Sequence, residues 1–224
     1  MIFTQEHNEI RRTVKNFVEN EINPYADEWE AAGTFPMKEI FKKLGDLGLL
    51  GISKPTEYGG MGLPYSYSIV AAEEFGLSKS GGVALAIGVQ TDMCTPALAR
   101  FGSDELREKF LKPAISGDMI GCIGVSEPGA GSDVAGLKTT AKKDGDDYII
   151  NGTKCWITHG KSSDVVVVIA RTGDLLDSHG MTTFIVDRSN PGLKAGKKED
   201  KLGMRASETA EVIFDNCRVP KSAV

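Results

Sequence analysis

The chain has 224 residues, of which 41% are hydrophobic and 25% charged, and its formal net charge at pH 7 is −5. These values are typical of a soluble globular protein of one large or two ordinary domains, and they exclude disordered, collagen-like and fibrous chains. Lys and Arg are scattered among Asp and Glu, without the basic stripe that a nucleic-acid-binding protein shows. The longest apolar run, Val165 to Ala170, is far too short to span a membrane.

The cysteines and histidines are widely and unevenly spaced, and no CxxC pair occurs. The cysteines are Cys94, Cys122, Cys155 and Cys217. We therefore predict no metal site, and we interpret the cysteines as small buried apolar residues, which favours a reducing compartment. The N-terminus resembles neither a secretory signal nor a transit peptide. We expect a bacterial cytoplasm or, once any import sequence is removed, a mitochondrial matrix, and not secretion.

The first half of the chain shows helical periodicity. Ile10, Val14, Phe17 and Val18 recur on one face of a helix, and Thr4 is placed to cap it. Further helices are predicted from Pro24 to Trp29, from Pro36 to a C-cap at Gly48, over 65–75, over 83–90, and over 104–114 with Ser103 as the cap.

The pattern changes to strands near Gly117–Asp118. Strands are predicted at Met119–Val125, 148–150, 153–157, 165–171, 182–186 and 210–214, with turns at 173–180 and 190–192. Asn151-Gly152 is the strongest hairpin signal, because this pair supplies the positive φ angles of a type I′ turn. No helical stretch interrupts the strands, so we predict an α+β fold: an N-terminal all-α helical domain (1–118), then an antiparallel β-barrel or sandwich domain (119–224).

A glycine-rich loop, Ser126–Asp133, follows the first predicted strand. It is not a dinucleotide fingerprint, because Val134 replaces the third glycine, and it is not a nucleophile elbow, because Pro128 replaces the second. Its backbone N–H groups and hydroxyls could cradle a polar, flat or phosphorylated ligand. An ordinary surface turn with an Asp cap explains the same residues equally well.

Three segments resemble the signatures of the acyl-CoA dehydrogenase family, in the family's order. They are GCIGVSEPGAGSDVAGLKTTA (121–141), YIINGTKCWITHG (148–160) and KLGMRASETAEVIFDNCRVP (201–220). The helical first half, including 95–102 and the helix after it, also resembles the family's N-terminal domain. The likeness covers essentially the whole chain, and it favours the ligand cradle over the ordinary turn.

The resemblance implies that FAD lies against the β-domain. The implied cofactor-binding residues are Ile123, Gly124, Val125, Ser126, Trp156, Ile157 and Thr158. Ser126, where the family more often has Thr, would hydrogen-bond the edge of the flavin ring, and Thr158 would lie near flavin N5. Gly131 and Ser132 would contact the entering acyl-CoA substrate. Without the motif, Trp156 is more simply a core aromatic, and the hydroxyls make ordinary turn or cross-strand hydrogen bonds.

The implied reaction is the α,β-dehydrogenation of an acyl-CoA thioester to a trans-2-enoyl-CoA. Electrons would leave through a second protein, commonly an electron-transferring flavoprotein. In the family the glutamate base lies in a C-terminal helical domain, and this chain stops at Val224 before such a domain. We therefore expect no catalytic residue in it, weak or no FAD binding by the chain alone, and a homo-oligomer, tetramer or dimer, only for a full-length chain.

Two carboxylate features are not assigned as the base. Glu127, followed by Pro128 in a turn, is interpreted as structural, and Glu73-Glu74 as a solvated pair or a helix-face ion pair. An acyl-CoA oxidase-like flavoprotein and a non-catalytic acyl-CoA-binding or assembly module remain alternatives. A nicotinamide-dependent enzyme is disfavoured because the fingerprint is incomplete.

Overall fold

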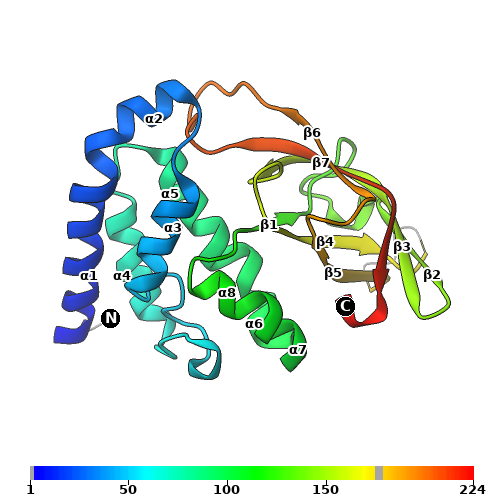
Figure 1. Ribbon diagram of the computed structural model, residues 1–224, viewed down its shortest axis with the longest axis horizontal. Coiled ribbons are helices and arrows are strands. Elements are labelled where there is room, and N and C mark those ends of the chain that lie inside the picture. The colour runs from blue at the N-terminus through cyan, green and yellow to red at the C-terminus, as the bar shows by residue number, and fades with distance from the viewer. Residues whose placement is uncertain (1–2, 175–178) are drawn as a thin grey trace. The chain divides into compact units, whose positions relative to one another are not determined.

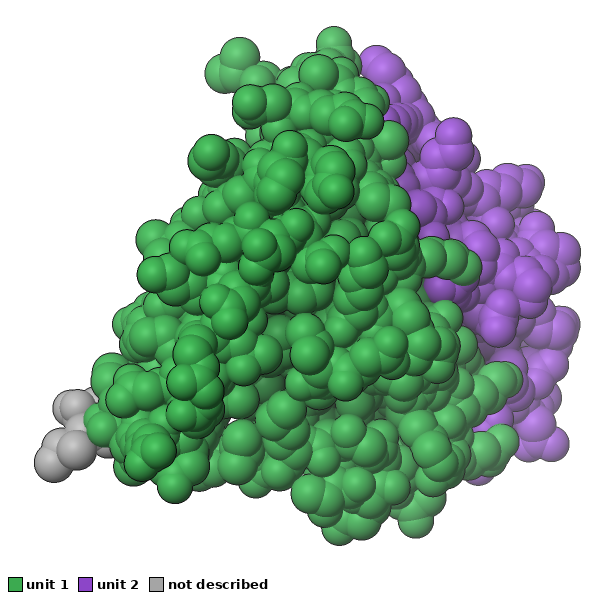
Figure 2. Space-filling view, turned by 60° about the vertical axis from the view of Figure 1, so that its left-hand side comes forward, with its two compact units in different colours: residues 1–120, 200–207 green, residues 121–199, 208–224 purple. Residues whose placement is uncertain are grey.

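A computed structural model describes residues 3–174 and 179–224 (Figure 1), so half of the turn predicted at 173–180 lies outside the described residues. The chain forms two compact units, coloured in Figure 2: Met1–Ile120 with Asp200–Ser207, and Gly121–Glu199 with Glu208–Val224. The first is helical and the second is a β-sheet, which confirms the α+β fold. The predicted boundary between two domains at 118/119 supposes that each part folds independently, and it stays a prediction.

In its described residues, the helical unit has eight α-helices joined in part by π-helical turns. They are α1 (Gln5–Phe17), α2 (Ala26–Ala32), α3 (Met37–Asp46), α4 (Tyr65–Phe75), α5 (Gly81–Gly88), α6 (Thr95–Phe101), α7 (Asp104–Leu106) and α8 (Lys112–Ile115). Thr4 is the extended N-cap of α1, and Ser103 accepts the Leu106 N–H at the start of α7, as predicted. The sequence did not predict α6, which follows directly on the π-helical segment Val89–Cys94 and has a proline in its first turn.

Helix α1 packs along α4 through polar as well as apolar contacts. The His7 ring stacks on Tyr67 with centroids 3.7 Å apart. Arg11 on α1 donates to Glu73 at 2.6 Å and to Glu74 at 2.8 Å. The glutamate pair of α4 is thus an ion-pair partner of a neighbouring helix, rather than of its own helix face.

The described part of the β unit forms a seven-stranded sheet. Its strands are β1 (Gly121–Gly124), β2 (Thr140–Asp144), β3 (Asp147–Thr158), β4 (Val165–Arg171), β5 (Met181–Asp187), β6 (Leu193–Lys198) and β7 (Thr209–Pro220). The order is β1-β4-β2-β3-β7-β6, with β5 pairing to β4. All pairings are antiparallel except those of β4 with β1 and with β2, so the prediction of a mostly antiparallel sheet is confirmed.

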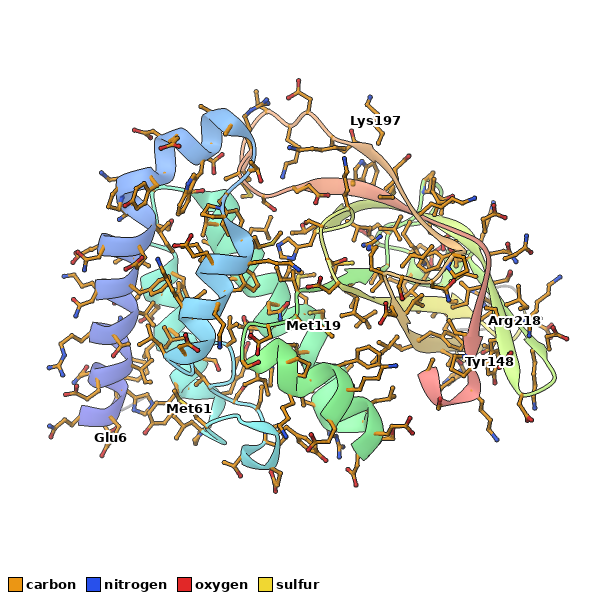
Figure 3. All side chains as sticks on the ribbon, viewed as in Figure 1. Glu6, Met61, Met119, Tyr148, Lys197 and Arg218 are labelled. Carbon is orange, nitrogen blue, oxygen red and sulfur yellow. The ribbon has the colours of Figure 1, made fainter. Side chains whose placement is uncertain are left out.

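The core of the β unit lies beneath β3, β4 and β7. The apolar run of β4 is buried along almost its whole length, as its sequence predicts. Tyr148 on β3 and Arg218 on the neighbouring β7 are labelled in Figure 3. Tyr148 meets Phe184 on β5 edge-on at 5.1 Å, and Arg218 forms ion pairs with Asp144 and Asp147.

The prediction of a hairpin turn at Asn151-Gly152 is wrong. These residues lie inside the twelve-residue strand β3, at a register shift against β7 between Ile150 and Gly152. A Cβ at Gly152 would lie 2.4 Å from Thr139 Oγ1, so glycine is required there by a close approach of the backbone and not by a turn. The actual hairpin joins β2 to β3 through Gly145 and Asp146, and Gly145 has φ +63°.

The four cysteines are buried, which confirms their interpretation as small core residues. Among residues 3–174 and 179–224, no helix combines the length and the apolar character needed to cross a membrane.

Candidate functional site

The end of β1 runs beside the end of β3. The Cys155 N–H donates to the Ser126 carbonyl at 2.9 Å, and Lys154 Nζ donates to the Val125 carbonyl at 3.0 Å. A Cβ at Gly124 would lie 3.1 Å from Lys154 Cγ, so the glycine makes room for the lysine stem. These contacts bring the predicted residues of β1 next to those of β3.

Lys154 and Glu127 form a buried ion pair under this junction. Lys154 is fully buried and its Nζ lies 2.8 Å from Glu127 Oε1. The Glu127 carboxylate also accepts the backbone N–H groups of Lys138 at 2.7 Å and Thr139 at 2.9 Å. Burial alone would raise the pKa of Glu127, but the hydrogen bonds, led by that from Lys154, hold its pKa below the ordinary value. Glu127 therefore stays ionised and holds the glycine-rich loop to β3 and to the segment just before β2.

Trp156 lies on a β-bulge. The pairing of β3 with β7 shifts between Lys154 and Ile157, which leaves two residues opposite one. Trp156 has φ +57°, a left-handed backbone that is uncommon for an aromatic residue, and its side chain is 64% exposed. It is therefore not the core aromatic that its strand context alone suggested; the bulge turns the indole outward, beside the Ser126–Cys155 contact.

The residues after Trp156 return to the sheet. Ile157 is buried and pairs with Ala210, while Thr158 is half-buried and pairs with Thr209. His159 follows with φ +62° and is fully buried, with Nδ1 3.2 Å from the Gly121 carbonyl. Burial lowers the pKa of His159, which favours a neutral ring that ties the end of β3 to the start of β1.

The glycine-rich loop is ordered by its own backbone. The N–H and carbonyl groups of Glu127 and Ala130 are exchanged in a tight turn. A Cβ built on Gly129 or Gly131 meets nothing within 4 Å, so the chain itself does not require glycine there. Gly131 and Ser132 are exposed. The backbone at these glycines has no side chain and faces open space, which allows a ligand to approach it closely.

The loop is also held from its far end by β4. Arg171 is buried, and its guanidinium donates to the carbonyls of Leu137 at 3.0 Å, Ala135 at 2.6 Å and Asp174 at 2.6 Å. Such planar multiple donation fixes a backbone segment more firmly than a single contact does.

The structure brings together Ile123 to Ser126 with Trp156 and keeps Ile157 and Thr158 on the same strand end. An exposed flat indole, half-buried hydroxyls at Ser126 and Thr158 and an unobstructed glycine backbone fit a ligand with a flat ring and polar edges, such as a flavin. Within the described part of the chain, no three His, Cys, Asp or Glu side chains gather as a metal site would require.

Lys154, Arg171 and His159 were missed by the sequence reasoning. Each is polar and buried, and each carries its signal only in three dimensions. The partner of Lys154 lies 27 residues away in the chain. Arg171 donates to backbone carbonyls, which every residue type has, so the sequence does not mark its acceptors.

Comparisons with known proteins agree with this construction. The family model "Acyl-CoA dehydrogenase, N-terminal domain" matches residues 4–118, and "Acyl-CoA dehydrogenase, middle domain" matches residues 122–217. The mitochondrial isovaleryl-CoA dehydrogenase of Pongo abelii is 43% identical over 99% of this chain and 53% of its own length. The human short-chain specific acyl-CoA dehydrogenase is 40% identical over 98% of this chain and 53% of its own.

A solved structure shows the same fold. Glutaryl-CoA dehydrogenase from Mycobacterium smegmatis in complex with FADH2 superimposes with a TM-score of 0.91 at 36% identity, over 99% of this chain and 55% of that one. The chain thus spans about half the length of the curated relatives it matches. With both domain models matched along it, the chain belongs to the acyl-CoA dehydrogenase family.

Proposed function

We propose that the β unit binds FAD, with the Trp156 indole packed on the flavin and the Ser126 and Thr158 hydroxyls at the edge of its ring. The observation that carries this proposal is the exposure of Trp156 on a β-bulge, where a large aromatic side chain has a strained backbone and little contact with its own protein. Strain and exposure of this kind persist where a ligand uses them.

The reaction proposed for the whole protein is dehydrogenation of an acyl-CoA thioester to a trans-2-enoyl-CoA. FAD, when bound, supplies the hydride acceptor, and the protein orients and tunes it. Gly131 and Ser132, exposed on the loop, are proposed to contact the substrate. An electron-transferring flavoprotein is the proposed electron acceptor, and a homo-oligomer in a mitochondrial matrix or a bacterial cytoplasm is the proposed setting.

The residues of this chain are proposed to bind and orient FAD and the substrate. They are not proposed to remove the substrate proton. Glu127 is the carboxylate nearest in sequence to the implied flavin residues. It already accepts hydrogen bonds from three donors, which keep it ionised and give it a structural role. We assign the general base to no residue of this chain.

The visible absorption spectrum of the purified chain tests the proposal, recorded before and after incubation with FAD and desalting. Because the chain alone is expected to bind FAD weakly, we expect most of the flavin band to be lost on desalting, but saturable FAD binding in a fluorescence titration that is weakened by substitution of Trp156. A chain that never retains or binds FAD, at any concentration tested by fluorescence titration, would contradict the assignment of these residues.

A further inference from the structure

The turn that joins β3 to β4 follows directly on the residues proposed to contact the flavin. It comprises residues 159–163 and begins one residue after Thr158. The Gly160 N–H donates to the Ile157 carbonyl at 3.0 Å. A Cβ at Gly160 would lie 2.9 Å from the Ala210 carbonyl oxygen, so the backbone of this β3–β4 turn is packed closely against β7. The turn and the end of β3 that carries Thr158 are therefore one packed unit.

Arg188 holds the β3–β4 turn from the end of β5. It is the first residue after β5, and β4 pairs with both β5 and β1 (Figure 1). Its guanidinium donates to the Ser163 carbonyl at 3.0 Å, to the Ser163 hydroxyl at 2.7 Å and to the Gly160 carbonyl at 2.8 Å. A guanidinium presents its donors in a rigid planar fork, so these three bonds together fix the turn in one position.

Ser163 connects Arg188 to β1. It is 2% exposed, and its hydroxyl oxygen must accept from Arg188, because a guanidinium has no acceptor. The hydroxyl proton is then free to be donated to Cys122 Sγ on β1, 3.2 Å away. Burial raises the pKa of Cys122 to about 11, and the Ser163 hydrogen bond and the charge of Arg188 oppose this rise only in part. The thiol therefore stays protonated at neutral pH and serves β1 as a neutral acceptor.

Two further contacts hold the same turn to β1 and to the start of β7. Nδ1 of His159 lies 3.2 Å from the Gly121 carbonyl oxygen of β1. Glu208, just before β7, accepts the Lys161 N–H at 2.9 Å through its carboxylate and the His159 N–H at 3.0 Å through its carbonyl. The start of β1 is thus tied to the turn after β3, while its far end is tied to β3 through the Ser126 carbonyl.

We propose that Arg188 is a positioning residue of the flavin site, which acts through the β3–β4 turn and Ser163 to set the placement of Thr158 relative to β1. This inference rests on the proposed function, which supplies the flavin. The residues proposed to contact the ring come from two strands, Ile123 to Ser126 on β1 and Thr158 on β3. A rigid ring meets both at once, so a small shift of one strand against the other weakens binding.

Arg188→Met tests the role, because it removes the guanidinium and keeps much of the apolar stem. Titration of the whole chain with FAD, followed by flavin fluorescence, should show an affinity about tenfold lower than that of the wild type, the scale of one charge-assisted hydrogen bond. The visible spectrum at saturating FAD should shift, because the Thr158 hydroxyl has moved relative to the ring. Arg188→Lys keeps the charge but not the fork, so its affinity should lie between the two.

Two control variants of the same unit separate positioning from a general loss of stability. Arg218→Met removes an exposed guanidinium from β7 and should change neither the affinity nor the spectrum. Val219→Ala, in the core of the β unit, should lower the free energy of unfolding and leave the spectrum of bound FAD unchanged. Urea unfolding of each variant gives the loss of stability with which its affinity is compared.

Two results would overturn the inference: an unchanged affinity and spectrum in Arg188→Met, or a spectral shift of equal size in Val219→Ala. If Arg188→Met fails to fold, Ser163→Ala decides, since it removes the link to Cys122 and keeps the bonds from Arg188 to backbone carbonyls. Ser163→Ala should give the same spectral shift with a smaller loss of affinity, and an unchanged spectrum there would also overturn the inference.

The wild-type titration separates this inference from the proposed function. A wild-type chain with no saturable FAD binding would refute the proposed function, and the role of Arg188 with it. Saturable binding by the wild type that does not depend on Arg188 would support the proposed function and refute this inference alone.

Discussion

Trp156 has the left-handed backbone that glycine adopts at least cost, and its ring is mostly exposed. Trp156→Gly should therefore leave the free energy of unfolding unchanged or raise it by about 1 kcal/mol. The same change removes the proposed flavin-stacking surface, so FAD affinity should fall by roughly tenfold or more, the scale of one aromatic contact. Urea unfolding and flavin fluorescence titration measure the two effects separately.

Asn216 provides the matched control for that substitution. It also has a positive φ, +48°, and it is exposed on β7 of the same unit. Asn216→Gly should relieve the backbone without changing FAD affinity. A loss of FAD binding in both variants would mean that the sheet, and not the indole, was affected.

Glu127 makes the free energy of unfolding of the β unit depend on pH in the acidic range. Its pKa is lowered in the folded state, so its contribution to stability is fully present above the ordinary carboxyl pKa of about 4.3 and is lost as the pH falls through the lower folded value. Glu127→Gln should destabilise the unit at pH 7, and the difference from wild type should shrink below pH ~4. Urea unfolding at several pH values measures it.

The control for Glu127→Gln is Glu105→Gln, at an exposed carboxylate on α7. It should change the unfolding free energy by only a few tenths of a kcal/mol at every pH, as is usual for the surface. If the gap between wild type and Glu127→Gln stayed constant down to pH 3, the buried pair would not be the acid-sensitive group.

At the scale of elements, strand β3 owes its shape to glycine at one position. A Cβ at Gly152 would meet Thr139 at 2.4 Å, and the backbone has φ +152°. Gly152→Ala should cost about 2 kcal/mol or more, because neither the strand nor Thr139 can move without disturbing the bulge. Gly129→Ala, where a Cβ meets nothing within 4 Å, should be nearly neutral. Equal unfolding free energies for the two variants would contradict this account.

The same position shows what local pattern can and cannot predict. Helices such as α4 and strands such as β4 were predicted to their ends, because one buried face or a buried apolar run fixes them. Asn151-Gly152 was misassigned because glycine is favoured both in a turn with positive φ and where another backbone segment comes close to the strand. Gly145-Asp146 makes the turn instead, which depends on the pairing of Asp144 with Asp147.

Those residues of the candidate site that lie in the family motifs were predicted from the sequence. Trp156 and Ser126 were brought together by the resemblance, and the structure places them on adjoining segments. The supports were not predicted, since Lys154 and Arg171 act on backbone carbonyls and on a distant carboxylate. Long-range polar contacts leave no periodic signal in the sequence.

At the scale of the whole chain, the sequence separates a helical half from a β half, but the units are not contiguous. Asp200–Ser207 lies between β6 and β7 and still belongs to the helical unit. Ala206 is buried in the helical core, and Arg205 and Ala206 donate their backbone N–H groups to Glu30 on α2 at 2.6 and 3.1 Å. Glu30 also accepts the hydroxyl of Ser80, the N-cap of α5.

A helical fragment ending at residue 120 should therefore be less stable than the same unit in the whole chain. It lacks the Ala206 contact and two of the donors to Glu30. Burial raises the pKa of Glu30, but hydrogen bonds, first from Ser80 and then from Ala206 and Arg205, lower it overall. Glu30→Gln should cost about 2 kcal/mol in the whole chain and clearly less in the fragment, where part of its task is already gone. Hydrogen exchange of α2 and α5 measures both, since exchange of their amides reports the opening of this corner of the unit. Equal protection in fragment and chain would show that 200–207 adds nothing to the helical unit, and a boundary near 118 would then describe an independent domain.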